Sequence, residues 1–170
     1  MDTKRFQHIV IALQPKLLRV AFVLLKDLEL AKDVVQEVSL KLWEMRDGLS
    51  LYDNLEAFSV RMTKNLCINQ LKSKHQQTMK MVSILPEGQH DKTPFRATVA
   101  KNDLEQVIQL MEGLTLQQRL IFQLRHFEGQ SFQEIAEATG LTINNIQVSL
   151  SRTRKRLKAR FKTIQDYGTT

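Results

Sequence analysis

Apolar residues recur every three or four positions over most of this chain, which is the spacing of helices that bury one face. No stretch alternates apolar and polar residues between turn signals, so the pattern predicts an all-α protein. Pro15 is expected to interrupt the N-terminal helical region, because proline lacks the backbone donor that a helix interior uses. The predicted helices span 16–26, 29–45, 55–74, 102–111, 116–126, 131–139 and 142–162.

The helical pattern fails between His75 and Lys101. This stretch contains Pro86, Gly88 and Pro94 and has no sustained apolar face, as is typical of a flexible linker. We therefore expect two small helical domains joined by that linker. The predicted boundaries are 1–75 for the first domain, 76–102 for the linker and 103–170 for the second domain.

Charge is unevenly distributed along the chain. The formal net charge is +7, and the first third holds many of the acids. No acid lies between Glu56 and Glu87 or between Glu137 and Asp166. A basic balance favours nucleic acid or another anionic surface as partner.

Residues 131–142 carry the signals of a helix-turn-helix. Ser131 and Glu134 have the spacing of a capping box, Gly140 can end that helix in a left-handed turn, and Thr142 can cap the next helix. Such a unit places its second helix in the major groove of DNA. The residues of that helix predicted to face inward are Ile143, Ile146, Leu150, Thr153 and Leu157.

The opposite face of this helix can read DNA. Amide side chains suit adenine, arginine suits guanine, and an apolar side chain can touch a thymine methyl. The run "SLSRTRKRLKARFK" that follows holds no acid and suits phosphate contacts, although its cations also suit the end of any solvated helix. The predicted reading residues are Thr142, Asn144, Asn145, Gln147, Val148, Ser151, Arg152 and Lys155.

The helix predicted over 29–45 has two stripes. An apolar seam of Val35, Val38, Leu42 and Met45 is expected to face the core. The second stripe mixes acids with an aromatic and a leucine, which is typical of a protein interface. For Trp43 alone, folding back onto the core is the favoured interpretation. The second stripe comprises Asp33, Gln36, Glu37, Leu40, Trp43 and Glu44.

These segments resemble a known family. "DVVQEVSLKLW" resembles the core-binding motif in region 2 of bacterial sigma-70 factors, and "LEAFSVRMTKNLCINQLKSK" resembles the promoter-melting helix that follows it. "MEGLTLQQRLIFQLRHFEGQSFQEIAEATGLTINNIQVSLSRTRKRL" is similar to region 4. The compact arrangement is like that of the extracytoplasmic function (ECF) group.

The resemblance implies partners and positions. The surface that docks on the β′ clamp helices of RNA polymerase is matched by Asp33, Gln36, Glu37 and Leu40. The β flap of the polymerase is a further implied partner of the chain. An anti-sigma factor is a further implied partner. Leu51, Tyr52, Asp53 and Asn54 match the loop that captures a flipped base of the non-template strand in the minus-10 element. The residues suited to that strand on the next helix are Arg61, Lys64, Asn65, Asn69 and Lys72, and those matching the minus-35 contact are Gln147, Val148, Ser151 and Arg152.

Other classes of protein fit the sequence less well. A dimeric helix-turn-helix regulator would leave the acidic stripe without a role. A recombinase would need a catalytic cluster, yet the four histidines are scattered, and we expect no catalysis, cofactor or metal. The basic run lacks the bulky apolar face of a membrane-surface helix. The single Cys67 allows no internal disulfide and is expected to be buried, and with no signal peptide or membrane segment evident we expect a cytoplasmic protein.

Overall fold

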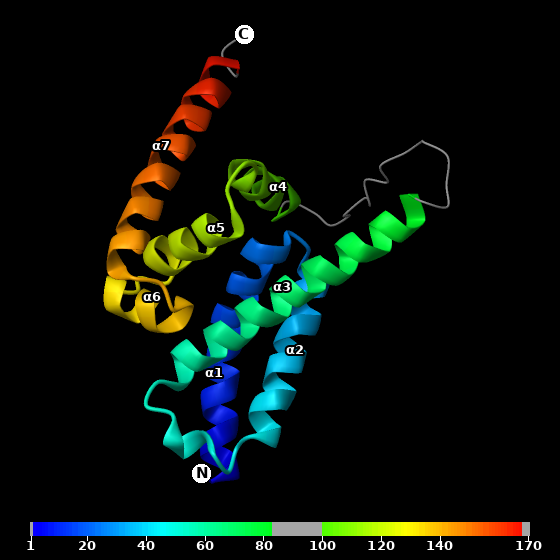
Figure 1. The fold of residues 1–170 in the computed structure, drawn as a ribbon, viewed down its shortest axis with the longest axis vertical. Helices are drawn as coiled ribbons and strands as arrows, with labels where there is room; N and C mark the ends of the chain where they lie inside the picture. The colour runs from blue at the N-terminus through cyan, green and yellow to red at the C-terminus, as the bar shows by residue number, and fades with distance from the viewer. Residues whose placement is uncertain (1, 83–99, 168–170) are drawn as a thin grey trace.

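A computed structural model describes residues 2–82 and 100–167 of the chain (Figure 1). These residues form helices and connecting turns without any strand, which confirms the predicted all-α class. The helices are α1 (Thr3–Leu25), α2 (Leu28–Glu44), the 3-10 helix η1 (Leu49–Leu51), α3 (Leu55–Val82), α4 (Ala100–Met111), α5 (Leu116–Phe122), the π-helix η2 (Gln123–Phe127), α6 (Phe132–Thr139) and α7 (Ile143–Tyr167).

The first three α-helices form the N-terminal bundle. α1 packs against both α2 and α3, and side chains such as Leu17, Val34 and Val60 are fully buried between them. The turn from α1 to α2 is fixed at both ends. Lys26 adopts a left-handed conformation with φ of 56°, and the Asp27 carboxylate accepts a hydrogen bond from the Leu30 N–H.

Two predicted helix limits in this bundle were wrong. Pro15 lies inside a continuous α1 and does not interrupt it, because its ring is exposed while burial of flanking residues such as Leu17 holds the helix together. α3 also continues to Val82, beyond the predicted end at 74. The described side chains after Leu71 are exposed, so the core gives this last part no apolar periodicity that a sequence pattern could reveal. Of the rest of the predicted linker, residues 83–99 lie outside the described residues, and residues 100–102 form the start of α4, two residues before the predicted beginning of that helix.

The C-terminal helices form the predicted helix-turn-helix. Ser131 and Glu134 make the reciprocal bonds of a capping box, and Gly140 ends α6 with φ of 76°. Thr142 Oγ1 then accepts a hydrogen bond of 3.2 Å from the Asn145 N–H at the start of α7. A second capping box, at Thr115, begins α5.

The inward face of α7 agrees with the prediction except at its first turn. Ile146, Leu150 and Thr153 are buried, whereas Ile143 is 40% exposed. Met45, predicted for the α2 seam, is likewise exposed at the end of its helix. Periodicity defines the direction of a helix face but not how far the neighbouring helices extend along it. Residues at the end of a helix, such as Ile143 and Met45, can therefore remain exposed.

The two groups of helices share one buried apolar cluster. α5 packs beside α1 and α6 packs against α3 (Figure 1), and the cluster includes Leu24 of α1 and Leu120 of α5.

α1 is long and apolar enough to cross a membrane by length and composition, but half of its most apolar window is buried in the protein. It therefore has the character of a core helix.

Candidate nucleic-acid and protein interfaces

The acidic stripe of α2 faces away from the bundle core. Asp33 and Gln36 are exposed, and Leu40 is 63% exposed although it is a large apolar residue. Glu37 is partly exposed, and its carboxylate lies 3.5 Å from the Lys41 Nζ. The structure thus brings the four predicted polymerase-binding residues together on one surface, with an apolar side chain among the charges as protein interfaces favour.

Trp43 lies at the end of this stripe and is only partly available. Its ring packs edge-on against the buried Phe6 with 5.5 Å between centroids, and the Arg46 guanidinium lies 4.6 Å from the Trp43 ring centroid. The interpretation that Trp43 folds back onto the core is confirmed, although 38% of the residue stays exposed.

The loop between α2 and α3 presents the residues predicted for the flipped base. Leu51 is 85% exposed, and Asp53 is exposed beside it. The Tyr52 ring is held against Phe58, with 4.3 Å between centroids. Asn54 caps α3 by accepting a hydrogen bond of 2.9 Å from the Ala57 N–H. Exposed apolar and aromatic side chains on an ordered turn can stack an unpaired base.

A row of polar and cationic side chains continues from this loop along α3. All five predicted residues lie at helical spacing and are exposed or partly exposed. The pKa of the Lys64 ammonium is lowered by burial and by repulsion from Arg61. Opposite them, Cys67 is fully buried and burial raises the pKa of its thiol to about 12, so the prediction of a buried apolar role is confirmed. The row comprises Arg61, Lys64, Asn65, Asn69 and Lys72.

The predicted duplex-reading residues all lie on the exposed side of the helix-turn-helix. Val148 is 40% exposed, and it lines a shallow polar hollow between α5 and α7 together with Asn145 and Arg152. The predicted reading residues, all of which are exposed, are Thr142, Asn144, Asn145, Gln147, Val148, Ser151, Arg152 and Lys155. Their arrangement fits a helix that enters the major groove.

Ionic and hydrogen-bonded contacts join the two groups of helices. The Arg19 guanidinium makes two parallel bonds to the Glu128 carboxylate, at 2.6 Å and 2.8 Å. The Glu56 carboxylate accepts from both Lys16, at 2.5 Å, and Gln130, at 2.9 Å. None of these contacts was predicted from the sequence. Local patterns carry no signal for them, because the Arg19 and Glu128 side chains come from positions 109 residues apart.

Glu128 is the most enclosed of these acids. Its side chain is only 4% exposed. The hydrogen bonds from Arg19 lower the pKa of the Glu128 carboxyl below the ordinary 4.5, with further help from a Gln123 hydrogen bond and against the effect of burial. A carboxylate whose pKa is lower in the folded than in the unfolded state stabilises the fold at pH values above the unfolded-state pKa. This contribution is lost as the pH falls through the lowered folded-state pKa.

We expect Glu128→Gln to lower the free energy of unfolding by about 1–3 kcal/mol at pH 7. The difference from the wild type should shrink as the pH falls from about 4.5 through the lowered pKa of the folded Glu128 carboxyl, because in that range the unfolded chain takes up a proton that the folded protein does not. Urea denaturation at a series of pH values measures both quantities. Glu105→Gln, at an exposed position of α4, serves as the control and should change stability by less than about 0.5 kcal/mol. A pH-independent difference would contradict the assignment.

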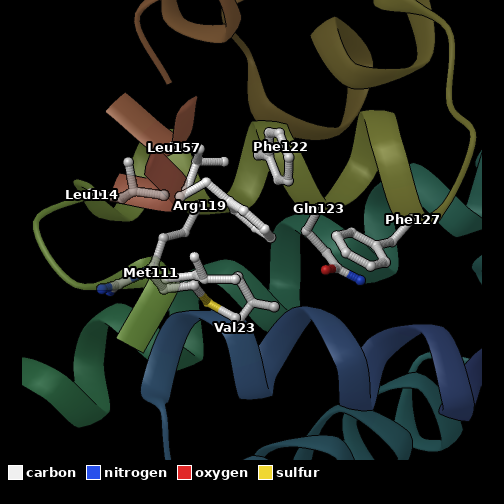
Figure 2. Close-up of a pocket in the computed structure, with 10 residues that line it drawn as sticks. Val23, Met111, Leu114, Arg119, Phe122, Gln123, Phe127 and Leu157 are labelled. Atoms are coloured by element: carbon white, nitrogen blue, oxygen red, sulfur yellow. The ribbon is translucent and has the colours of Figure 1, made fainter. Parts of the chain in front are cut away.

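An apolar hollow opens where α1, α5 and α7 meet (Figure 2). Its walls include Val23, Phe122, Phe127 and Leu157, and Phe127 is 67% exposed. Arg119 reaches into this hollow and donates to the Leu24 carbonyl oxygen at 3.1 Å, while its buried Nε has no hydrogen-bond partner among the residues that the structure describes. Burial lowers the pKa of the Arg119 guanidinium. The hollow therefore combines an apolar surface with an incompletely paired cation.

Together these features define a class of protein: an all-helical, helix-turn-helix DNA-binding protein with a second helical bundle that presents an acidic stripe and a separate cationic row. The family model for Sigma-70 region 2 matches residues 9–77, and that for Sigma-70, region 4 matches residues 104–157. The two matches together cover most of the chain in the family's order. This chain belongs to the sigma-70 family, as its sequence motifs predicted.

Two solved structures share the fold. The sigma factor RpoE, in complex with the anti-sigma factor NepR from Bartonella quintana, is 22% identical with a TM-score of 0.74, over 94% of this chain and 98% of that chain. CnrH, in complex with the cytosolic domain of CnrY, is 19% identical with a TM-score of 0.71, over 95% of this chain and 90% of that chain. A search of curated protein sequences gave no significant match.

Proposed function

We propose that this chain is a bacterial sigma factor of the ECF group, which binds core RNA polymerase and directs promoter-specific initiation of transcription. The observation that carries this proposal is the succession of sigma-70 regions 2 and 4 on two groups of helices. The interval between the two matches is too short for a further helical domain, which is consistent with the compact ECF arrangement.

Each surface has a part in this function. The α2 stripe of Asp33, Gln36, Glu37 and Leu40 would dock on the β′ clamp helices, and region 4 would contact the β flap. The loop 51–54 and the α3 row would hold the non-template strand of the minus-10 element, while α7 reads the minus-35 element as duplex. The polymerase performs the phosphodiester chemistry, so the chain needs no catalytic group of its own, and it would act in the cytoplasm.

An anti-sigma factor is the second protein partner that we propose. Its expected footprint is the α2 stripe or the DNA-reading face of region 4, since covering either surface blocks initiation. The apolar hollow of Figure 2 lies close to region 4 and would extend such a footprint. The matched structures of RpoE and CnrH were both solved with a partner bound, which supports this proposal by likeness of fold.

A dimeric helix-turn-helix regulator is the alternative function. It would read symmetric half-sites with region 4 and use the N-terminal bundle for dimerisation. The region 2 match over residues 9–77 disfavours this alternative, because that region is the part of a sigma factor that serves polymerase binding and promoter opening.

Reconstitution with bacterial core RNA polymerase tests the proposal. We expect the purified chain to co-elute with core polymerase in size-exclusion chromatography and to produce discrete transcripts from a fragmented genomic library. On its own the chain should bind duplex DNA weakly and with strong salt dependence, because it offers few phosphate contacts. Absence of association, together with tight binding of symmetric duplex sites by the chain alone, would establish the dimeric regulator instead.

A further inference from the structure

The apolar hollow where α1, α5 and α7 meet is large enough to hold a small ligand (Figure 2). Its volume is about 240 Å³, and an apolar cavity of about 150 Å³ in another protein is sufficient to bind benzene. Phe127 and Phe161 line the hollow and are 67% and 54% exposed, so part of its aromatic wall is open to solvent. The hollow can therefore receive an apolar chain of several carbons from solvent.

One end of this hollow carries a cluster of cationic side chains. Arg119 lies at the end of the hollow opposite Phe127 (Figure 2). Burial lowers the pKa of the Lys26 ammonium, and repulsion from Arg119 lowers it further. Glu112 opposes this effect, but its carboxylate lies 3.6 Å from the Arg160 guanidinium, which also repels Lys26. The hollow therefore has an aromatic end and a cationic end.

The Arg119 guanidinium has donors that the protein does not use. A guanidinium carries five N–H groups. Within the described part of the chain, Arg119 donates one hydrogen bond, to the neutral Leu24 carbonyl oxygen. Its Nε is buried and has no hydrogen-bond partner among the described residues. Leaving a buried charged donor unpaired is unfavourable, because water cannot supply the missing acceptor. An anionic oxygen at this end of the hollow would remove that penalty.

The geometry points to a binding site for an amphipathic carboxylate, with an apolar chain of about eight carbons in the hollow and the carboxylate on Arg119 and Lys26. A wholly apolar occupant could pack equally well against Phe122 and Leu157, but it would leave the Arg119 Nε without a partner. The carboxylate is therefore the group that selects the ligand. This inference goes beyond the proposed function and does not depend on it.

Octanoate is the probe, and isothermal titration calorimetry with the full chain measures its binding. We expect a Kd of about 1 mM or tighter, which a well-placed ligand of roughly ten non-hydrogen atoms can reach. 1-Octanol carries the same chain without the charge and should bind about tenfold more weakly, because it lacks the charge-assisted hydrogen bonds. In ¹H–¹³C spectra, octanoate should shift the methyl signals of Val23, Leu114 and Leu157, which line the hollow.

Two variants test the two ends of the hollow, each with a matched control. Arg119→Met keeps an unbranched side chain of good helix propensity, and it should bind octanoate about tenfold more weakly but 1-octanol within about twofold of the wild type. Arg5→Met removes the same charge at an exposed position near the other end of α1 and should bind both probes as the wild type does.

Phe127→Ala shortens an exposed side chain and should weaken the binding of octanoate and 1-octanol alike, by about threefold. Ile11→Ala, at a position that is 64% exposed on α1, is its control and should leave both affinities unchanged. Thermal melts followed by circular dichroism check that every variant is folded.

A preference of the wild type for octanoate over 1-octanol that is lost in Arg119→Met supports the inference. Absence of octanoate binding, equal affinity for the two probes, or shifts confined to residues outside the hollow would overturn it and favour an apolar segment of a protein partner as the occupant. A dimer in sedimentation velocity that Phe127→Ala weakens and octanoate leaves intact would assign the hollow to a second copy of the chain, which also overturns the inference. Polymerase is absent from all of these measurements, so failure of the reconstitution would overturn the proposed function alone.

Discussion

Reversing two charges on the α2 stripe is expected to abolish association with core polymerase. In Asp33→Arg/Glu37→Arg, two acidic side chains of the proposed polymerase-docking surface become basic, so groups that pair with the acids would be repelled. Like charges brought together at an interface cost several kcal/mol, so affinity should fall by at least about a hundredfold. Size-exclusion co-elution with core polymerase and transcription from the genomic library measure the loss.

The exposure of this stripe makes the experiment interpretable. Asp33 is exposed, and Glu37 is partly exposed and makes an ion pair of 3.5 Å with Lys41, so the double reversal should change the free energy of unfolding by less than about 1 kcal/mol. Asp2→Arg/Glu105→Arg reverses two charges elsewhere on the surface and should leave co-elution intact. Leu40→Ala removes the exposed leucine of the stripe without changing charge, and it should weaken association by about tenfold. Full co-elution of the Asp33→Arg/Glu37→Arg protein would show that the polymerase-docking surface lies elsewhere.

The largest loss of stability is expected from shortening the core residue that holds α7 in place. Leu150 is 1% exposed within the cluster that joins α7 to the rest of region 4. Leu150→Ala leaves a cavity and should lower the free energy of unfolding by about 2–5 kcal/mol. Because small domains are stable by only about 5–15 kcal/mol, this change should visibly shift the urea midpoint and the melting temperature.

A neighbouring residue on the same helix separates stability from recognition. Val148 is 40% exposed and lies among the predicted minus-35 contacts. Val148→Ala should therefore change stability by less than about 1 kcal/mol but alter the promoters selected in transcription, because it removes an apolar contact available to a thymine methyl.

Equal stability of the Leu150→Ala and wild-type proteins would show that α7 is not anchored through the Leu150 side chain.

Local signals in the sequence were sufficient for much of region 4. Ser131, Gly140 and Thr142 define where α6 begins and ends and where α7 begins, and all three act as predicted because caps and turns depend on residues within a few positions of each other. The exposed reading face of α7 follows from the same helical period. These features are encoded locally, so no knowledge of distant contacts is needed to predict them.

Local signals did not predict the length of a helix or the burial of its residues where these depend on contacts with neighbouring helices. Pro15 remains inside α1, and Ile143 and Met45 are exposed, because packing decides which helix interiors persist and how far a buried face extends. α3 continues to Val82 with exposed side chains, where an apolar pattern gives no signal.

The sequence by itself determined the all-helical class, the helix-turn-helix, the acidic stripe and the family, because these depend on short-range spacing and on motifs in a particular order. Only the tertiary structure decided that Glu137 meets Asn54 and Arg61, and that Glu128 meets Arg19. Those partners are separated by 76 to 109 residues, and no periodicity links charges so far apart. Their meeting depends on how the two groups of helices pack.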